Sequence, residues 1–461
     1  MKLSLKLNFI FLSVALLFTF MQESPLLSST LDISKLRFPV TKTILPNGLT
    51  ILMHVDHSVP TISYQTWFRV GSKYEDPGYT GIAHLFEHMM FKGAKRYSGK
   101  EFDQLLQANG ITNNAFTTYD YTGYFEDLPS SKLELVMDIE SDRMVNLALT
   151  PENLKSEREV VKEERRWRVD NSIIGSMNEI LWSSAYKVHP YKWPVIGWMA
   201  DIDALTLERC KTFYHTYYSP ANAVIAIVGD FDPVTATTLI NKYYADLPKV
   251  VVPKRELPSE PVQTQERSSV VSKIAQTGYV AMAYHTTKQG DQDGYVLDLI
   301  ANILAEGDSS RLFKRLVYRE QKALGVDASS ITPQDPGVFQ FSVELKPNIA
   351  GPPIIGEIES ELAQLAKHKV TAHELEKAKN QTMKHWVDSL KRIHDKAYSL
   401  ILNEIVTGSY TNLFDDLEKY DKVTPDDVQR VAQKYFTKNN LTALTLNPET
   451  PKATKGKPHD S

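Results

Sequence analysis

Apolar residues along the chain gather in short runs that are separated by longer amphipathic stretches. The runs Thr61–Val70, Ala223–Val228 and Leu441–Leu446 predict strands, and the last two each follow an amphipathic stretch that predicts a helix. Asn47-Gly48 stands between two apolar runs, which is typical of a hairpin turn. Because strands and helices do not alternate strictly, the pattern predicts an α+β fold with largely antiparallel sheets.

The chain contains the same pattern twice. Residues 206–222 (TLERCKTFYHTYYSPAN) align without a gap on residues 424–440 (TPDDVQRVAQKYFTKNN), an offset of 218 that places Thr206 on Thr424. A second predicted helix also recurs, starting at Thr150 and at Thr371. The stretch between the copies is rich in proline and polar residues, as in an extended linker. We therefore predict two homologous units, 30–247 and 267–447, joined by a linker at 248–266.

The N-terminal residues differ from the rest of the chain. Lys2 and Lys6 precede an apolar run from Leu7 to Met21, which is the layout of a secretory signal peptide. The run is shorter than the about 20 residues that cross a membrane. We predict a signal peptide at 1–29 and an exported protein, periplasmic or secreted, without a membrane span in its mature part. No clean cleavage site follows the run, so an uncleaved anchor is the alternative. Residues 448–461 are predicted to be a polar tail.

Composition excludes several classes of protein. Hydrophobic residues make up 42% and charged residues 23% of the 461 positions, which is typical of a globular protein with sizeable cores. A formal net charge of -4 argues against nucleic acid as a partner. Cys210 is the one cysteine, so an internal disulfide and a cysteine-rich metal site are both excluded. We expect it to be a small buried apolar residue.

The candidate chemistry begins at residues 84–88, which read HLFEH. On a helix His84, Glu87 and His88 project from one face, and this is the inverted zinc signature H-x-x-E-H. Thr80 and Gly81 just upstream suit a helix start. Zinc bound by two imidazoles needs a third protein ligand and an open position. The carboxylate between the histidines is then placed to take a proton from an attacking water.

The third ligand is expected to be acidic and to lie on another helix. A helix is predicted from Pro151, with Thr150 as its N-cap. Its sequence SEREVVKEERRW carries Glu157 and Glu164, which are two turns apart on one stripe of the helix. Glu163 beside them points elsewhere.

These segments together resemble the pitrilysin/insulinase-type metallopeptidases. HLFEH is followed 76 positions later by the last Glu of EREVVKEE, and the resemblance runs from about residue 38 to 447. Residues 114–124 (NAFTTYDYTGY) resemble the strand beside the metal, and 189–197 (HPYKWPVIG) the substrate-side loop. The resemblance implies two homologous halves per chain and pairing of such chains into a clamshell that encloses a peptide substrate.

The resemblance also implies roles for single residues. His84, His88 and Glu164 are the implied ligands of one zinc ion per chain, Glu87 the catalytic base and Glu157 a support behind the ligands. The family pattern suggests that an extended substrate binds along the strand of Asn114 and Ala115, as an added β-strand. In the second half, residues 298–302 (DLIAN) stand where HLFEH stands in the first. That half is therefore predicted to be inactive.

One position departs from the family pattern. Family members carry an Arg and, seven residues later, a Tyr that stabilise the reacting carbonyl and the substrate backbone. Here Arg319 is present, but Val326 stands in place of the Tyr. We expect a homologous partner chain to supply the complete Arg–Tyr pair, with a homodimer as the alternative. Arg319 has two interpretations, a substrate contact or an ordinary salt bridge.

Two functions follow from the sequence. The first is a zinc-dependent endopeptidase that hydrolyses unfolded peptides or small polypeptides, with Glu87 as general base. The second is a non-catalytic binding or scaffold subunit of the same family. The intact Glu87 favours the first, because a scaffold has no need of a base.

Overall fold

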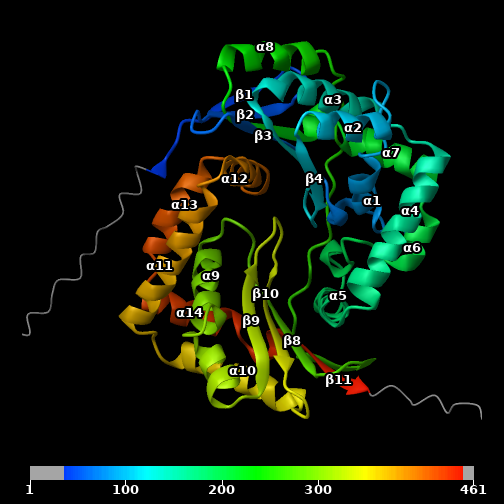
Figure 1. Ribbon diagram of the computed structural model, residues 1–461. Coiled ribbons are helices and arrows are strands. Elements are labelled where there is room, and N and C mark those ends of the chain that lie inside the picture. Colours follow the sequence, from blue (N-terminus) through cyan, green and yellow to red (C-terminus); the bar gives the residue numbers. More distant parts are fainter. Residues whose placement is uncertain (1–35, 450–461) are drawn as a thin grey trace, which may run out of the picture. The chain divides into compact units, whose positions relative to one another are not determined.

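The computed structural model describes residues 36–449. The predicted signal peptide and residues 450–461 of the predicted tail lie outside the described residues. Residues 38–449 belong to one unit that holds both copies of the repeat (Figure 1). Within residues 36–449, no helix has both the length and the apolar character needed to cross a bilayer.

Each half of this unit contains one sheet. The first sheet has the order β1-β2-β6-β3-β5-β4. Its strands are β1 (Thr41–Ile44), β2 (Thr50–Val55), β3 (Thr61–Phe68), β4 (Thr112–Thr117), β5 (Thr122–Pro129) and β6 (Ala223–Gly229). The second sheet has the order β7-β11-β8-β10-β9. Its strands are β7 (Arg267–Ile274), β8 (Tyr279–His285), β9 (Ala323–Ile331), β10 (Val338–Leu345) and β11 (Leu441–Glu449).

The two sheets share one topology. Apart from β1, each strand of the first sheet has a counterpart at the same place in the second. The pairs β2–β6 and β7–β11 are parallel, and all other neighbours are antiparallel. The prediction of two homologous α+β units with largely antiparallel sheets is confirmed. The hairpin at Asn47-Gly48 is confirmed as well, with Gly48 at φ 95°.

Helices surround both sheets. Those of the first half are α1 (Ile82–Met89), α2 (Gly99–Ala108), α3 (Leu133–Asn146), α4 (Pro151–Arg165), α5 (Ile173–Ala185), α6 (Met199–Ala204), α7 (Leu207–Tyr217) and α8 (Pro233–Tyr244). Those of the second half are α9 (Gln292–Ala305), α10 (Gly351–Lys367), α11 (Ala372–Ser389), α12 (Ile393–Val406), α13 (Asn412–Asp421) and α14 (Pro425–Tyr435). Short π-helices, η4 (Arg166–Asp170) and η7 (Phe313–Arg319), follow α4 and α9. The 3-10 helices are η2 (Ser72–Tyr74), η3 (Ser130–Lys132), η5 (Pro190–Lys192), η6 (Pro220–Asn222) and η8 (Lys438–Asn440).

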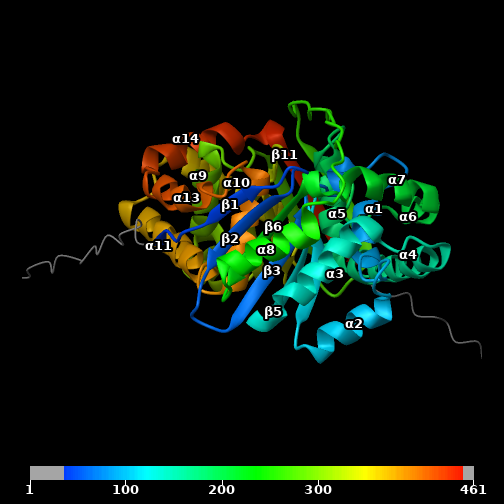
Figure 2. The same ribbon diagram turned by 90° about the horizontal axis from the view of Figure 1, so that it is seen from above.

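The repeated helices begin where the sequence predicts. Thr206 and Thr424 cap α7 and α14, and each hydroxyl accepts a hydrogen bond from the backbone N–H three residues later. Thr150 and Thr371 cap α4 and α11 in the same way. Helices α3 and α8 lie over the outer face of the first sheet (Figure 2), in one core that also contains the buried Cys210.

Each half lends a helix to the sheet of the other. Helix α12 of the second half packs on β3 and β6 of the first, and its Leu400 and Ile401 belong to one buried cluster with Leu52 and Trp67. Helix α5 of the first half packs on β8 and β11 of the second, in the buried cluster that contains Leu181. The exchange makes the two halves interdependent, because neither sheet is fully covered by helices of its own half.

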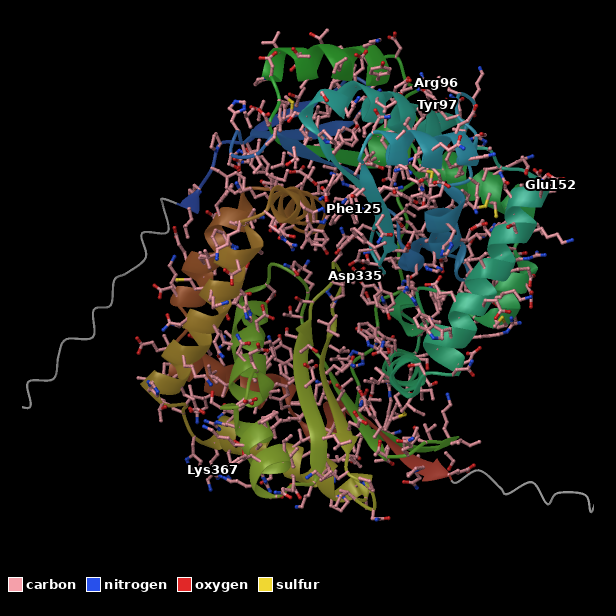
Figure 3. All side chains as sticks on the ribbon, viewed as in Figure 1. Arg96, Tyr97, Phe125, Glu152, Asp335 and Lys367 are labelled. Atoms are coloured by element: carbon pink, nitrogen blue, oxygen red, sulfur yellow. The ribbon has the colours of Figure 1, made fainter. Side chains whose placement is uncertain are left out.

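A buried polar network also joins the halves. The ammonium of Lys73 lies 2.9 Å from carboxylate oxygens of both Asp120 and Asp335. The hydroxyl of Tyr191 donates to Asp120 over 2.7 Å and accepts from the Asp335 N–H over 3.1 Å. Asp335 comes from the β9–β10 turn, and in Figure 3 it lies between the two halves. The network therefore fixes the sheets of the two halves against each other.

Candidate metal centre

Helix α1 presents the HLFEH motif. His84 is buried, His88 is partly exposed, and their ring centroids lie 4.9 Å apart. The helix begins at Gly81, whose φ of 89° suits glycine. A Cβ at this position would lie 2.6 Å from the carbonyl oxygen of Ile196, so a side chain is excluded by space as well.

The predicted helix start needs one correction. The Thr80 hydroxyl does not cap α1; it donates to Asp201 over 2.7 Å and accepts from the Trp198 N–H. The cap comes instead from the buried Glu75, whose two carboxylate oxygens accept from the N–H groups of Gly81 and Ala83. A carboxylate at a helix N-terminus also has a favourable interaction with the helix dipole.

Helix α4 brings two carboxylates to α1. Glu164 Oε2 lies 3.1 Å from His88 Nε2 and 3.7 Å from His84 Nε2. Glu157, two turns earlier, places its Oε2 3.7 Å from His88 Nδ1. The imidazole of His88 thus lies between the two carboxylates. Glu163 points away and pairs with Arg166 at the surface.

These donors fit a zinc ion. One donor atom from each of His84, His88 and Glu164 lies within 4.8 Å of the others. Bonds of about 2.0–2.2 Å at a tetrahedral ion place neighbouring donors roughly 3.4 Å apart, close to the two separations at Glu164 Oε2. Two imidazoles and one carboxylate are also a donor set that zinc prefers. The ligand roles of the three residues stay a prediction, which this geometry supports.

Burial and charge act differently on the two histidines. Burial lowers the pKa of His84 to about 4, so its imidazole is neutral at physiological pH. Burial also disfavours the charged form of His88, but the carboxylates of Glu157 and Glu164 outweigh it and raise the pKa of His88 to about 9. The same contacts hold the pKa of both carboxyls below the usual value despite their burial. A metal ion competes with that proton for the histidine nitrogen.

Glu87 faces the same site from α1. Its Oε2 lies 4.0 Å from His84 Nε2 and accepts a hydrogen bond of 2.7 Å from the Thr117 hydroxyl. Burial raises the pKa of Glu87, while the Thr117 hydroxyl partly opposes the shift. Thr117 is the last residue of β4, so this bond attaches the candidate base to the edge of the first sheet.

Strand β4 carries the predicted substrate residues and is an edge strand. It pairs with β5 alone, and Asn114 is exposed on it. The Ala115 N–H bonds the side-chain oxygen of Asn114. A cavity of about 340 Å³ lies between β4 and the candidate metal centre. Its lining consists of His84, Glu87, Asn114, Ala115, Phe116, Thr117, Glu164, Arg168, Val169, Val195 and Ile196.

The segment expected on the substrate side divides into two parts. Val195 and Ile196 line the cavity, as expected. His189 and Tyr191 are buried instead in the polar network between the halves, where the His189 Nε2 lies 3.6 Å from Asp335. This part of the segment lies away from the cavity because the Tyr191 hydroxyl forms hydrogen bonds with residues of both halves.

Arg319 lies away from this centre. It ends η7 in the second half and is exposed, and no hydrogen bond or ion pair among residues 36–449 joins it to the candidate metal ligands. Val326 lies on β9, opposite Val343 of β10. Within this chain, the position of the missing tyrosine is therefore not part of the centre.

Sequence reasoning missed three supporting residues. Lys92 stands four residues after His88 and contacts Glu157, and Arg168 stands four residues after Glu164 and contacts it. For Arg168 the spacing, typical of neighbours on one helix face, is a signal present in the sequence, whereas Lys92 lies beyond the end of α1 and reaches a carboxylate of another helix. Glu75 had no such signal, because only the tertiary fold brings it to the start of α1.

Comparison with known proteins gives a consistent result. A family model described as "Insulinase (Peptidase family M16)" matches residues 50–197, and one described as "Peptidase M16 inactive domain" matches residues 204–382. The chain is 32% identical to a zinc protease, PqqE, of Helicobacter pylori, over 88% of this chain and 92% of that one. It is 25% identical to an uncharacterized zinc protease, SCO5738, of Streptomyces coelicolor, over 86% of each chain.

Solved structures agree with the fold. A crystal structure of a protease from Helicobacter pylori superposes with a TM-score of 0.86 at 31% identity, covering 89% of this chain and 100% of that one. A peptidase M16 inactive domain from Pseudomonas fluorescens superposes with a TM-score of 0.79 at 18% identity, covering 89% and 98%. The arrangement of two sheets with their helices is thus one that known proteins share.

Proposed function

Because the chain belongs to the insulinase family of peptidases (M16), we propose that it is a zinc-dependent endopeptidase acting on unfolded peptides or small polypeptides. The observation that carries this proposal is the position of Glu87. Its carboxylate lies beside the donor cluster of His84, His88 and Glu164 and faces the same cavity. A protein that only binds peptides would gain nothing from a partly buried carboxylate held there.

In the proposed reaction the protein positions the substrate and moves one proton. The chemistry that bound zinc supplies is polarisation of the scissile carbonyl and acidification of a water. Glu87 accepts the proton of the attacking water and returns it to the leaving nitrogen. The Thr117 hydroxyl orients Glu87, because it donates to the carboxylate oxygen that faces His84.

The edge of β4 is the proposed binding surface for the substrate. An extended peptide that adds to this edge would form backbone hydrogen bonds along Asn114 and Ala115. Such binding depends little on side chains, which suits a protease of unfolded polypeptides. Phe116 and Val169 supply apolar lining beside the strand.

A partner chain is part of the proposal. Val326 cannot donate a hydrogen bond, and one missing donor to the developing oxyanion costs about 2.7–4 kcal/mol in comparable sites. We therefore propose that a homologous chain supplies the Arg–Tyr pair, with self-pairing as the alternative. The test is the activity of the chain purified alone: full activity without a second polypeptide would contradict this part.

The same proposal includes export. The basic start and apolar run of residues 1–29 support a periplasmic or secreted location. Mass spectrometry of the N-terminus of the protein isolated from its host tests this. An intact N-terminus in a cytosolic fraction would contradict it.

The central experiment separates catalysis from metal binding. The chain is isolated from its host together with any partner, and its zinc content and cleavage of a quenched peptide are measured for the wild type and Glu87→Gln. We expect the variant to keep its zinc and to lose about 10²–10⁴-fold in cleavage rate, the usual contribution of a general base. Chelation should abolish wild-type cleavage.

Glu163→Gln is the matched control, because this exposed carboxylate lies next to a proposed ligand but points away from the centre. It should leave zinc and cleavage unchanged. If Glu87→Gln cleaves as fast as the wild type, Glu87 is not the base. If the wild type binds zinc but cleaves nothing in its native complex, the scaffold function replaces the protease.

A further inference from the structure

Two cations lie directly outside the candidate metal ligands. Arg168 Nε lies 3.0 Å from Glu164 Oε1, and Lys92 Nζ lies 2.7 Å from Glu157 Oε1. In both carboxylates the other oxygen, Oε2, faces the imidazole of His88. Each carboxylate is therefore held at one oxygen by a cation and presents the other oxygen to the histidine.

The local fold places both cations. Arg168 lies on η4, the π-helix that follows directly after α4 ends at Arg165. Such π-helical turns occur often at functional sites. Lys92 follows the end of α1, four residues after His88. Both cations are thus tied by the backbone to a proposed ligand of the metal.

The two pairs join exposed cations to enclosed carboxylates. The Arg168 side chain is 64% exposed and that of Lys92 37%, whereas the carboxylates of Glu164 and Glu157 are 16% and 4% exposed. A solvated cation loses little hydration in such a pair, while the enclosed carboxylate gains a partner. Each carboxylate has two equivalent oxygens, and in each pair the cation contacts only one of them.

We propose that Arg168 and Lys92 are positioning residues for the metal centre. Arg168 occupies Glu164 Oε1, so that Glu164 offers the single oxygen Oε2 to the metal. Lys92 holds Glu157, whose Oε2 in turn fixes the orientation of the His88 ring through Nδ1. The proposal rests on the proposed function, because it assumes that zinc binds at His84, His88 and Glu164.

A different role for Arg168 makes an opposite prediction. Arg168 also lines the cavity beside β4, so its guanidinium is placed where it would reach a substrate carbonyl or carboxylate. In that role its loss would raise KM and leave zinc affinity unchanged. A purely electrostatic role is distinguishable too, since removing a cation close to a divalent ion would tighten zinc binding.

The experiment measures zinc affinity directly. The zinc dissociation constant of the full chain is determined by competition with a chromophoric chelator, and the absorption spectrum of the cobalt-substituted protein reports ligand geometry. We expect Arg168→Ala and Lys92→Ala to weaken zinc binding by about 10- to 100-fold, as for other outer-shell partners of metal ligands. The cobalt spectrum should shift in both, and Arg168→Lys should recover part of the affinity.

Two neighbouring cations provide matched controls. Arg166 pairs with Glu163, and Lys162 pairs with Glu159 and Asp203, on the same helical segment but away from the centre. Arg166→Ala and Lys162→Ala should leave both readouts unchanged. Unaltered or tighter zinc binding in Arg168→Ala and Lys92→Ala would overturn the proposal, as would a change in KM alone. A wild-type chain that binds no zinc would instead overturn the proposed function itself.

Discussion

The two halves of the molecule place the same pair of helices against the same kind of sheet, and only one pair carries a metal-binding set of donors. Aligning Gly93 with Gly307, and Thr150 with Thr371, pairs the four key positions of α1 and α4 with α9 and α11. The counterparts of His84, His88, Glu157 and Glu164 are Asp298, Asn302, Ala378 and His385. In the described residues of the second half no metal-binding trio is found.

The second helix pair carries hydrogen bonds where the first carries the donor cluster. The Asn302 amide donates to the Thr382 hydroxyl over 2.7 Å, joining α9 to α11. Asp298 accepts a hydrogen bond of 2.6 Å from the Tyr420 hydroxyl. Burial raises the pKa of Asp298 to about 6, whereas it lowers the pKa of His84 to about 4. In both halves burial favours the neutral side chain, but only a neutral histidine is a good metal donor.

The cavities beside these helices differ in the same way. The cavity of the first half lies beside β4 and is lined by His84 and Glu164, two of the three proposed donors. Asp298 and Ser330 line a cavity of about 410 Å³, and the turn Thr118–Tyr121 of the first half forms part of its wall. The repeated fold thus supplies two similar sites. The identity of the side chains, together with the neighbouring half, decides that only the first site contains a set of metal donors.

The largest expected effect comes from breaking the centre that only the first half possesses. Glu164→Ala should remove zinc and cleavage together, by more than the about 10- to 100-fold that outer-shell residues contribute to metal affinity. The equivalent change His385→Ala in the second half should leave both unchanged. Metal analysis and a peptide cleavage assay on both variants measure this. Equal losses in the two variants would contradict the functional asymmetry of the halves.

Because α5 and α12 are exchanged between the halves, a cavity created by substitution in either helix should lower the stability of the whole unit. Leu181 of α5 and Leu400 of α12 are both fully buried. Replacing either by Ala should lower the free energy of unfolding by about 2–5 kcal/mol. Urea unfolding should show one transition, because each helix covers the sheet of the other half. Leu324→Ala is the control, since this side chain is 50% exposed and should change stability by less than about 0.5 kcal/mol.

The enclosed carboxyl of Asp298 in the second half should make stability depend on pH. Its folded pKa is raised, so the protonated form contributes stability below about pH 4 that is lost as the pH rises through about 6. Asp298→Asn keeps an acceptor for Tyr420 and should add about 1–3 kcal/mol at pH 8. The free energy of unfolding of the wild type and the variant, measured between pH 4 and 8, should diverge as the pH rises. Parallel curves would show that the pKa of Asp298 is not raised in the folded protein.

The smallest expected effect concerns the edge of β4. The Ala115 N–H donates to the side-chain oxygen of its neighbour Asn114, and the proposal requires an added strand to take over this N–H. Ala115→Pro should raise KM, because it removes one backbone hydrogen bond that contributes about 0.5–1.5 kcal/mol to substrate binding. The zinc content of the variant should not change. Ala115→Ser retains the N–H and serves as the control. An unchanged KM in Ala115→Pro would argue against substrate binding at this edge.

Much of the fold was predictable because it rests on local signals. The aligned segments 206–222 and 424–440 predict helix α7 before strand β6 and helix α14 before strand β11. Thr206 and Thr424 mark where the two helices begin. The HLFEH spacing places three side chains on one helix face whatever the surroundings are. Glu75 was not predictable, because its contact with the start of α1 depends on how a preceding turn packs.

By itself the sequence determined which residues can share a face: two histidines and a carboxylate on α1, two carboxylates on α4, and a second copy of the pattern without them. Only the tertiary structure decided how these faces meet. It brought Glu164 within 3.1 Å of His88, placed β4 beside Glu87 through Thr117, and exchanged α5 and α12 between the halves. The physical reason is that helix periodicity acts over a few residues, whereas packing of apolar faces and pairing of buried charges join residues far apart in the chain.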